Sequence, residues 1–510
     1  MEKVVILDFG GQYTHLIARR VRELGVYSEI KSFTTPVEKL TEKGVKGIIL
    51  SGGPKRILDR DSPKCSTEIF NLNIPVLGIC YGHQLIAHLL GGKVSKGVVG
   101  EYGKTILEIR EINELFKGLS GREIVWMSHF DSVASLPCEL KILASTKNTP
   151  VAAFKHVSKK IYGVQFHPEV RHTVNGKVVL KNFLFEICGC SGGWKPEDIV
   201  KEKVNEIRNM VGGDEAVICA LSGGIDSATT ALIASRAIGE RLTCIFVDHG
   251  FLRKGEVQEV LETMRKMNVK VRYVDARERF AEKLRGIQDP EEKRKIIGEE
   301  FIKVFEEEAK KIRNVKWLAQ GTIYPDRVES GAVGRETSRI KSHHNVAALP
   351  KKMNLKLIEP LRDLYKDEVR KVAKKLGLPD EVVYRHPFPG PGLAVRIIGE
   401  VTPEKLRISR AANAILEEEL KKTGLYREVW QAFIVVGNDK WTGVMGDERR
   451  EGYIVTIRIV KSEDGMTADW VQIPYEVLEK ISNRITNEVK GVTMVTYAIS
   501  SKPPSTIEPQ

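Results

Sequence analysis

The first part of the chain alternates short apolar runs with stretches in which apolar residues recur at helical spacing. The apolar runs VVILDF, GIIL and IPVLGIC end near residues 9, 50 and 80, and helical spacing covers residues 15–24 and 84–90. Strands that alternate with helices in this way are typical of an α/β domain with a largely parallel sheet. We therefore expect a doubly wound parallel-sheet domain over residues 1–190.

The same alternation returns after SGGWKP, a polar, Gly-containing stretch at residues 191–196 that is typical of a linker. An amphipathic helix is expected over residues 199–212, and the apolar runs VICAL, LTCIFVD and VKVRYVDA are expected as strands. The densely charged residues 277–313 form either a lid beside a ligand site or a solvated helical hairpin. We expect a second doubly wound parallel-sheet domain over residues 191–388.

A cluster of prolines and glycines in RHPFPGPGLAVRIIGE forbids regular structure and marks the next boundary. Beyond it, helical patterns (AANAILEEELKKTG and EVLEKISNRITNEV) are mixed with strand patterns (AFIVVG, YIVTIRIV and TMVTYAIS). We expect a small α+β domain over residues 389–510, in which helices cover one face of a short antiparallel sheet. The other face needs cover as well, so the pattern predicts a homodimer through this domain.

The composition of the 510 residues is that of a globular protein, with 42% hydrophobic and 29% charged residues. No apolar run approaches the ~20 residues of a membrane span, and the start MEKVVILDFGGQ does not fit a signal peptide. The seven cysteines are an odd number confined to the first half of the chain, which makes a disulfide framework improbable. We expect a cytoplasmic protein with no membrane partner.

A net charge of +13 is compatible with a protein that binds nucleic acid. However, Lys and Arg are interleaved with Glu, as in KRKIIGEEFIKVFEEEAKKIR, which indicates solvated helix faces. We expect no nucleic-acid partner, although the excess positive charge would attract nucleotide phosphates.

The run VICAL leads into the turn SGGIDS at residues 222–227 and then into a helical pattern. A Gly-rich turn between a strand and a helix binds phosphate, because free backbone N–H groups and the positive helix end converge there. No Lys follows the glycines, which disfavours an ordinary P-loop. Asp226 is also the candidate Mg²⁺ ligand. The candidate nucleotide-binding residues are Ser222, Gly223, Gly224, Ile225, Asp226, Ser227, Ala228 and, at the carboxyl end of the next strand, Asp248.

A candidate nucleophile, Cys80, stands between Gly78 and Gly82 where a strand turns into a helix. This is the arrangement of a nucleophile elbow with sulfur in place of oxygen, and the helix N-terminus favours the thiolate. His167 and Glu169, two apart on an extended segment, face the same side and could serve as base and orienting group. The candidate oxyanion donors are the loop at Gly52 and Gly53 and the N–H of Tyr81.

These motifs carry resemblances to known families. GICYGHQ, FHPE and SGGP resemble the class I glutamine amidotransferases, and SGGIDS resembles the pyrophosphate loop of the N-type ATP pyrophosphatases. The segments KSHHNV, EPLRDLYKDEVR, HPFPGPGLAVRIIGE, DGMTADW and SSKPPSTIE resemble the glutamine-hydrolysing GMP synthetases, in the domain order of that family.

The resemblance implies ATP-dependent amination of xanthosine monophosphate (XMP) to GMP through an adenylyl-XMP intermediate. Glutamine is the nitrogen donor, ATP is a co-substrate, and AMP, pyrophosphate and glutamate are released, with Mg²⁺ as cofactor. It also implies that Gln84 contacts glutamine and that the last domain dimerises. The residues expected to bind XMP are Arg327, Lys341, Lys502, Thr506, Ile507 and Glu508.

The sequence is also compatible with two other classes of function. One is another amide-transferring ATP pyrophosphatase, such as an NAD synthetase or a tRNA-thiolating enzyme. A thiolating enzyme is disfavoured because Cys219 and Cys244 lie within apolar strands. The other is a non-catalytic nucleotide-binding regulator, which would not need the set Cys80, His167 and Glu169.

Overall fold

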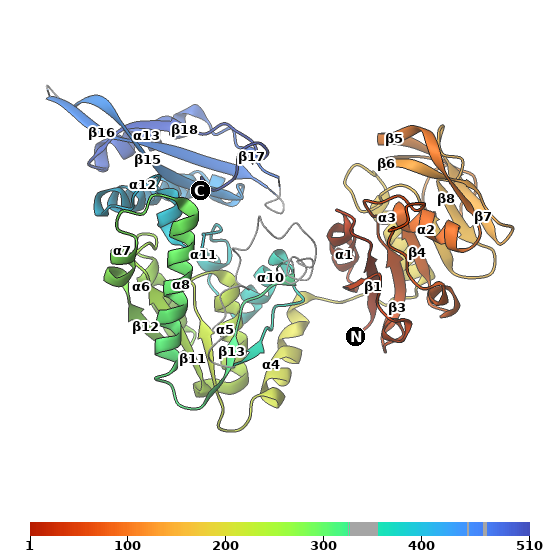
Figure 1. Cartoon of the computed structure of the whole chain (residues 1–510), viewed down its shortest axis with the longest axis horizontal. Helices are drawn as coiled ribbons and strands as arrows, with labels where there is room; N and C mark the ends of the chain where they lie inside the picture. Colours follow the sequence, from red (N-terminus) through yellow and green to blue (C-terminus); the bar gives the residue numbers. More distant parts are fainter. Residues whose placement is uncertain (325, 327–354, 446–447, 463–466, 510) are drawn as a thin grey trace. The chain divides into compact units, whose positions relative to one another are not determined.

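The computed structural model describes residues 1–324, 326, 355–445, 448–462 and 467–509. The chain divides into two compact units, residues 1–195 and 196–510 (Figure 1). The domain boundary predicted at residues 388–389 therefore lies within the second unit. None of the described helices combines the length and the apolar character that a membrane span requires.

The first unit is built on one nine-stranded sheet in the order β2-β1-β3-β4-β9-β8-β7-β5-β6. The strands from β2 to β9 in this order run parallel, and the remaining pairings are antiparallel. The antiparallel half was not expected from the sequence. The strands are β1 (Lys3–Asp8), β2 (Tyr27–Ser32), β3 (Val45–Leu50), β4 (Val76–Ile79), β5 (Lys93–Ile109), β6 (Arg122–Ser135), β7 (Leu140–Ser145), β8 (Ala153–His156) and β9 (Ile161–Val164).

Helices cover the parallel part of this sheet. The helices α1 (Thr14–Glu23) and α3 (Gly176–Asn182) pack against each other. The helix α2 (Tyr81–Leu89) places Tyr81, Leu85 and Ile86 in a core with buried residues of β1, β3 and β4. Since α2 follows β4 directly, the residue between them is held at the carboxyl edge of the sheet.

The end of the first unit is anchored by Trp194. Its backbone N–H donates to the carbonyl of Gly25 at 2.9 Å, and its ring lies 5.6 Å from that of Tyr27. The guanidinium of Arg22 lies over both rings, 4.7 Å from the Tyr27 centroid and 5.6 Å from that of Trp194. Lys195 is exposed and Pro196 is already buried in the second unit. The connection between the units is therefore very short.

The second unit begins with a parallel five-stranded sheet in the order β12-β11-β10-β13-β14. From β10 the chain adds β11 and β12 on one side of the sheet and then β13 and β14 on the other. Ligands of open α/β sheets bind where the strand order switches in this way. The strands are β10 (Ala216–Ala220), β11 (Leu242–Asp248), β12 (Val271–Asp275), β13 (Val315–Ala319) and β14 (Lys356–Ile358). The helices of this part are α4 (Ile199–Met210), α5 (Ile225–Ile238), α6 (Glu256–Lys266), α7 (Arg277–Lys283), α8 (Pro290–Ala309), α10 (Lys366–Leu376) and α11 (Asp380–Val383).

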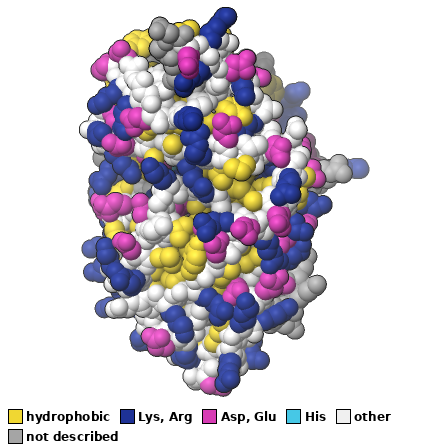
Figure 2. Space-filling view, turned by 90° about the vertical axis from the view of Figure 1, so that its left-hand side faces the viewer, with side chains coloured by type: hydrophobic (Ala, Val, Ile, Leu, Met, Phe, Trp, Pro, Cys, Tyr) yellow, Lys and Arg dark blue, Asp and Glu magenta, His cyan; other side chains and the backbone are white. Residues whose placement is uncertain are grey.

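The densely charged residues 277–313 fold into α7 and α8, which contact each other. Their apolar positions, including Phe280, Ile297 and Phe305, pack in one core with Ile218 and Ile245 of the sheet. The segment thus resembles the predicted helical hairpin, with one side buried. On the face shown in Figure 2, Lys and Arg side chains are interspersed with Asp and Glu side chains.

The C-terminal part of the second unit forms a further sheet in the order β15-β16-β17, with β18 beside β16. The expectation of an antiparallel sheet was wrong for β18, which runs parallel to β16 because α13 carries the chain back between them. The elements are α12 (Pro403–Lys422), β15 (Gln431–Met445), β16 (Glu448–Lys461), β17 (Asp469–Trp470), α13 (Tyr475–Glu488) and β18 (Val492–Tyr497).

The two faces of β15 have different surroundings. Ala432, Ile434 and Val436 pack with α12 and α13 in the domain core. Phe433, which points to the other face, lies under the guanidinium of Arg396 at 4.2 Å. Residues of the same chain therefore cover part of the face that the sequence assigned to a dimer contact. The predicted class, two doubly wound parallel-sheet α/β domains followed by a small α+β domain, is confirmed, with an antiparallel extension on the first sheet.

Candidate active site

Cys80 lies at a sharp turn between β4 and α2, with φ of 53° and ψ of −103°. A non-glycine residue at positive φ is strained, and such strain is common at functional sites. The flanking glycines permit the turn: a Cβ on Gly78 would lie 2.5 Å from the Gly82 carbonyl, and one on Gly82 would lie 2.4 Å from the Leu50 oxygen. The backbone therefore forms the predicted nucleophile elbow, and Cys80 is 8% exposed.

His167 and Glu169 are brought together beside this turn. The Nδ1 atom of His167 lies 2.7 Å from Oε1 of Glu169, and both residues are buried. Burial lowers the pKa of His167, but the negative charges of Glu169 and of the Cys80 thiolate outweigh it and raise that pKa well above its ordinary value. The pair can therefore accept a proton from a nearby thiol and hold it.

We expect Glu169→Gln to destabilise the first unit more strongly at pH 6 than at pH 9. The folded-state pKa of His167 is raised, so the stabilisation from the pair is complete below the unfolded value of about 6.5 and fades as the pH rises through the folded value. Removing one partner of a buried pair typically costs about 3 kcal/mol or more. Urea unfolding at pH 6 and pH 9 measures the difference.

A matched control is Glu186→Gln, because Glu186 makes an exposed pair with Lys117 at 3.1 Å. That variant should lose no more than about 1 kcal/mol at either pH. An equal loss for Glu169→Gln at both pH values would contradict the assignment of a charged pair.

The loop after β3 lies directly over the elbow. A Cβ on Gly52 would stand 3.5 Å from Cε1 of His167 and 3.9 Å from Cβ of Cys80, so this glycine borders the space between them. Gly53 fits closely as well, since its Cβ would lie 3.1 Å from the ring of Tyr81. The Ser51 carbonyl accepts from the N–H of Gly82 at 3.1 Å and ties the loop to α2. The candidate oxyanion donors of Gly52, Gly53 and Tyr81 are thus gathered at one place.

Two buried side-chain amides lie behind the sulfur. Gln84 donates from Nε2 to the Asp131 carbonyl at 2.7 Å and to Oε1 of Gln165 at 3.1 Å. Nε2 of Gln165 lies 3.7 Å from Sγ of Cys80. Gln165 was missed in the sequence, although its place two residues before His167 puts it on the same side of an extended segment.

The phosphate-loop candidate forms between β10 and α5. Gly223 has a φ of 78°, which favours glycine. Ser227 closes the turn: its Oγ accepts from the N–H of Ser222 at 3.1 Å and donates to the Gly224 carbonyl at 3.1 Å. The N–H groups of Ile225, Asp226 and Ala228 belong to the first turn of the 14-residue helix α5, so the positive helix end faces this loop.

Asp226 carries the charge of this loop. Its Oδ2 atom accepts from Nζ of Lys366 at 2.6 Å, while Oδ1 is buried and has no hydrogen-bond partner among the described residues. A carboxylate oxygen without a hydrogen bond, beside a candidate phosphate site, fits Mg²⁺, which takes carboxylate and phosphate oxygens. The described residues contain no group of three His, Cys, Asp or Glu side chains that could hold a metal ion alone. A Mg²⁺ ion here would therefore depend on the phosphates of its nucleotide.

Lys366 at the start of α10 and Arg385 were missed as loop neighbours. Nη1 of Arg385 donates to the Gly223 carbonyl at 3.4 Å, and its Nη2 donates to Glu259 at 2.6 Å. Lys366 lies within LYKDEVR, but nothing in the spacing of that helical pattern connects it with a loop 140 residues earlier.

Asp248 ends β11 as predicted and is buried. Its carboxylate accepts from the N–H of Gly250 at 2.9 Å and from the hydroxyl of Tyr273 at 3.2 Å. The strand β11 is adjacent to β10, so Asp248 lies on the same edge of the sheet as the phosphate loop.

The side chain of Glu508 anchors the C-terminal tail to the rest of the second unit. Glu508 accepts two hydrogen bonds from the guanidinium of Arg396, at 2.8 and 3.0 Å, and one from Nε2 of Gln431 at 2.6 Å. Arg396 is 2% exposed. The Glu508 carboxylate, predicted to help hold XMP, is therefore engaged with the protein, and no pattern in the sequence indicated its two partners.

The remaining predicted tail residues lie around this anchor. Lys502 pairs through its backbone with Ala468, and the Thr506 carbonyl accepts from Arg458 at 3.2 Å. Ile507 is partly exposed next to Glu508. The predicted XMP residues Arg327 and Lys341 lie outside the described residues.

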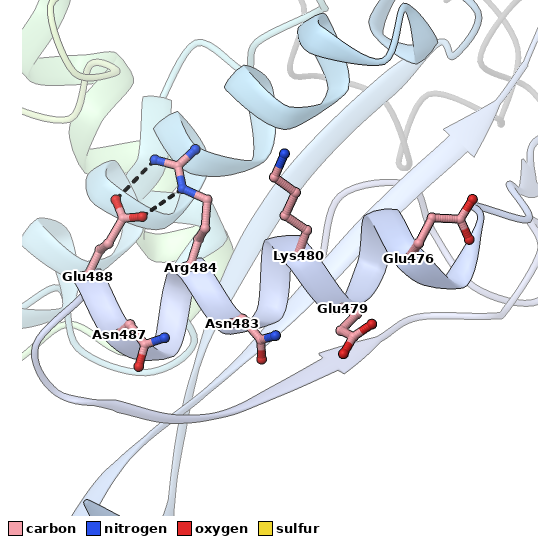
Figure 3. A pocket seen from close by; sticks show the side chains of 7 residues that line it. All are labelled: Glu476, Glu479, Lys480, Asn483, Arg484, Asn487 and Glu488. Carbon is pink, nitrogen blue, oxygen red and sulfur yellow. Dashed lines mark hydrogen bonds and ion pairs between the residues drawn. The ribbon is translucent and has the colours of Figure 1, made fainter.

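A separate pocket of about 300 Å³ runs along α13 (Figure 3). Arg484 and Glu488, which line it, pair with each other at 2.6 and 3.0 Å. Its lining carries both charges and contains none of the predicted site residues, so we assign it no chemistry. The lining residues are Glu476, Glu479, Lys480, Asn483, Arg484, Asn487 and Glu488.

Comparison with known proteins finds three families along the chain. The family described as glutamine amidotransferase class-I matches residues 5–187. The NAD synthase family matches residues 195–302, and the GMP synthase C terminal domain matches residues 418–509. The NAD synthase match includes the phosphate loop and Asp248, and the last match includes the tail.

Relatives extend over the whole chain. A protein of Pyrobaculum aerophilum named "GMP synthase [glutamine-hydrolyzing]" is 57% identical over 509 residues, covering 100% of both chains. Proteins of the same name from Carboxydothermus hydrogenoformans and Caldicellulosiruptor saccharolyticus are 55% and 56% identical, each covering 99% of both chains.

Proposed function

Since this chain belongs to the family of glutamine-hydrolysing GMP synthases, we propose that its candidate sites divide the family reaction between the two units. The enzyme aminates XMP to GMP with glutamine as nitrogen donor and ATP as co-substrate, via adenylyl-XMP, in purine biosynthesis. The observation that carries the proposal is the strained Cys80 beside the His167–Glu169 pair, in a different unit from the phosphate loop. The test is whether the two half-reactions fail separately when Cys80 or Asp226 is replaced.

In the first unit, Cys80 attacks the side-chain amide carbon of glutamine. His167 takes the thiol proton and passes it to the departing nitrogen, so ammonia leaves and a glutamyl thioester remains. The N–H groups of the Gly52–Gly53 loop and of Tyr81 stabilise the oxyanion of each tetrahedral intermediate. Water activated by His167 then hydrolyses the thioester to glutamate and restores the thiol, with Glu169 holding the imidazole in orientation. Gln84 lies beside this site, where it donates hydrogen bonds to the Asp131 carbonyl and to Gln165.

In the second unit, residues 222–228 bind the β and γ phosphates of ATP and Asp248 holds its nucleoside end. The 2-oxo oxygen of XMP attacks the α phosphorus and pyrophosphate leaves, because the oxygen needs activation before ammonia can displace it. The loop N–H groups and the α5 N-terminus stabilise the pyrophosphate. Mg²⁺ held by Asp226 and phosphate oxygens would supply further positive charge for this departure. Ammonia then attacks C2, and AMP leaves.

The tail holds XMP in this proposal. Lys502 supplies a positive charge for the monoester phosphate and Thr506 a hydroxyl, while Ile507 supplies a backbone N–H. Glu508 acts by fixing the tail to the buried Arg396, since its carboxylate is already engaged there. Arg327 and Lys341 complete the XMP site in this proposal.

Deleting residues 502–510 is expected to raise the KM for XMP about ten-fold or more, because a lost charge-assisted contact is worth about 1.5–3 kcal/mol. Glutamine hydrolysis and the KM for ATP should change little, since these sites are formed by other segments. Steady-state kinetics with ammonium salts as the nitrogen source measure the effect.

Deletion of residues 509–510 alone serves as the matched control, because it leaves Glu508 and its anchor in place. It should change the KM for XMP by less than about two-fold. If the chain lacking residues 502–510 used XMP as well as the intact chain, the assignment of the tail would be wrong.

A homodimer and a cytoplasmic location complete the proposal. Trp441, Val444, Tyr475 and Ile499 of the C-terminal part are large apolar side chains more than half exposed, and such surfaces favour association between copies. All seven cysteines are free thiols, which suits a reducing compartment.

A further inference from the structure

Gln165 occupies a position level with Cys80 in the sheet. The strands β4 and β9 are parallel neighbours with Ile79 opposite Val164, so the next residues, Cys80 and Gln165, emerge side by side at the carboxyl edge. The backbone N–H of Cys80 donates to the Val164 carbonyl at 2.9 Å and that of Gln165 to the Ala152 carbonyl at 2.8 Å. Gln165 is fully buried. Its side chain is therefore held rigidly next to the sulfur.

The orientation of the Gln165 amide is determined by its neighbour. Nε2 of Gln84 has two acceptors, the Asp131 carbonyl at 2.7 Å and Oε1 of Gln165 at 3.1 Å. If the Gln165 amide were flipped, its NH₂ group would face the NH₂ of Gln84 and its oxygen would face the sulfur. The observed orientation avoids the contact between two NH₂ groups and aims an N–H donor at Sγ of Cys80, 3.7 Å away; the flipped oxygen would oppose the sulfur once it is a thiolate.

The sulfur has a second polar neighbour. The Ser128 carbonyl lies 3.8 Å from Sγ and can accept from the thiol S–H. Once the proton has moved to His167, this carbonyl opposes the negative sulfur, whereas an N–H donor stabilises it. The resting thiol and the reactive thiolate thus have separate partners on the protein.

We propose that Gln165, with its amide oriented by Gln84, is a positioning residue that stabilises the Cys80 thiolate and holds it for attack on glutamine. The inference rests on the proposed role of Cys80 as nucleophile. It adds a donor to the sulfur itself, in addition to the base and the oxyanion donors. Gln165 acts through Cys80 and takes no part in proton transfer.

The titratable groups that face this network are His83, His129, His167, Glu169 and, beyond His129, Glu101. Burial lowers the pKa of His83 to about 3, so this histidine is neutral near pH 7. Burial also lowers the pKa of His129. His167 is therefore the one imidazolium beside the sulfur among the described residues, and Gln165 provides an additional, neutral donor.

The test uses the full-length protein with Gln165→Leu, which removes the donor, and Gln165→Glu, which keeps the shape and turns an oxygen toward the sulfur. Alkylation of Cys80 by iodoacetamide is followed against pH by peptide mass spectrometry, so that the other six cysteines do not interfere. We expect the midpoint of the pH dependence to rise by about one unit for Leu and further for Glu. Glutaminase kcat/KM should fall about ten-fold or more, mainly through kcat, with ammonia-dependent synthesis unchanged.

Asn182→Leu is the matched control, because Asn182 is another buried amide of the first unit and donates to the carbonyls of Leu115 and Lys117. It should leave the alkylation midpoint in place even where it lowers thermal stability. If Gln165→Leu does not fold, Gln165→Glu carries the test. An unchanged midpoint in a folded Gln165 variant overturns the inference, even if activity falls. If glutaminase activity survived in Cys80→Ala, the proposed function would fail instead, independently of Gln165.

Discussion

Cys80→Ala is expected to abolish glutamine-dependent GMP synthesis while synthesis from ammonium salts stays nearly intact. The substitution removes the sulfur that forms the thioester, and no other group can replace it at the elbow. Adenylation of XMP depends on the phosphate loop, which lies in the other unit. The loss of glutaminase activity should reach about 10⁴-fold or more, the scale found when a catalytic nucleophile is removed. Assays of GMP formation with each nitrogen source, side by side, measure it.

The matched control is Cys65→Ala. Cys65 is also 8% exposed and lies in the same hydrophobic core as Tyr81, but it is not at the elbow. This variant should retain both activities to within about two-fold. If Cys80→Ala lost both activities equally in a folded protein, the separation of the two sites would be wrong.

Asp226→Ala should remove synthesis with either nitrogen source. The substitution takes away the carboxylate of the phosphate loop and leaves Lys366 without its partner at 2.6 Å. Loss of an electrostatic contact to a departing group lowers the rate by about 100-fold or more. Exchange of labelled pyrophosphate into ATP, measured with XMP present, isolates the adenylation step. Glutamine hydrolysis by the first unit should continue.

Asp214→Ala is a matched control for this variant, since Asp214 precedes the opposite end of β10 and accepts a hydrogen bond from Asn314 at 3.0 Å. It should leave pyrophosphate exchange almost unchanged. Asp226→Asn tests the charge with the shape preserved, and we expect it to require more Mg²⁺ for the remaining activity. Undiminished exchange in Asp226→Ala would show that residues 222–228 are not the ATP site.

Local patterns in the sequence were sufficient for the elements that bear the chemistry. The glycines around Cys80 and the turn SGGIDS predicted their conformations, because only small residues fit where a Cβ would meet a carbonyl at 2.4–2.5 Å or where φ is 78°. The pairing of His167 with Glu169 followed from the two-residue period of an extended segment. These features depend on residues close together in the chain.

Contacts between distant segments were not predictable in the same way. The parallel pairing of β18 with β16 and the antiparallel half of the first sheet depend on which strands become neighbours, and apolar alternation does not encode this. Glu508 pairs with Arg396, which lies 112 residues away in the sequence, and Gln165 contacts Cys80, which lies 85 residues away. Which polar side chains become partners depends on the tertiary fold. A single sequence therefore shows the residue types but does not show which of them pair.

Trp194 is anchored in the first unit and Pro196 is buried in the second, so a single residue, Lys195, connects them. With so short a tether, each glutaminase centre always has the synthetase centre of its own chain available, whatever the enzyme concentration. The rate at which each chain uses its ammonia then does not depend on the enzyme concentration. The ratio of GMP formed to glutamine consumed should accordingly be the same in nanomolar and micromolar enzyme, whereas units produced as separate polypeptides should lose it on dilution below their dissociation constant.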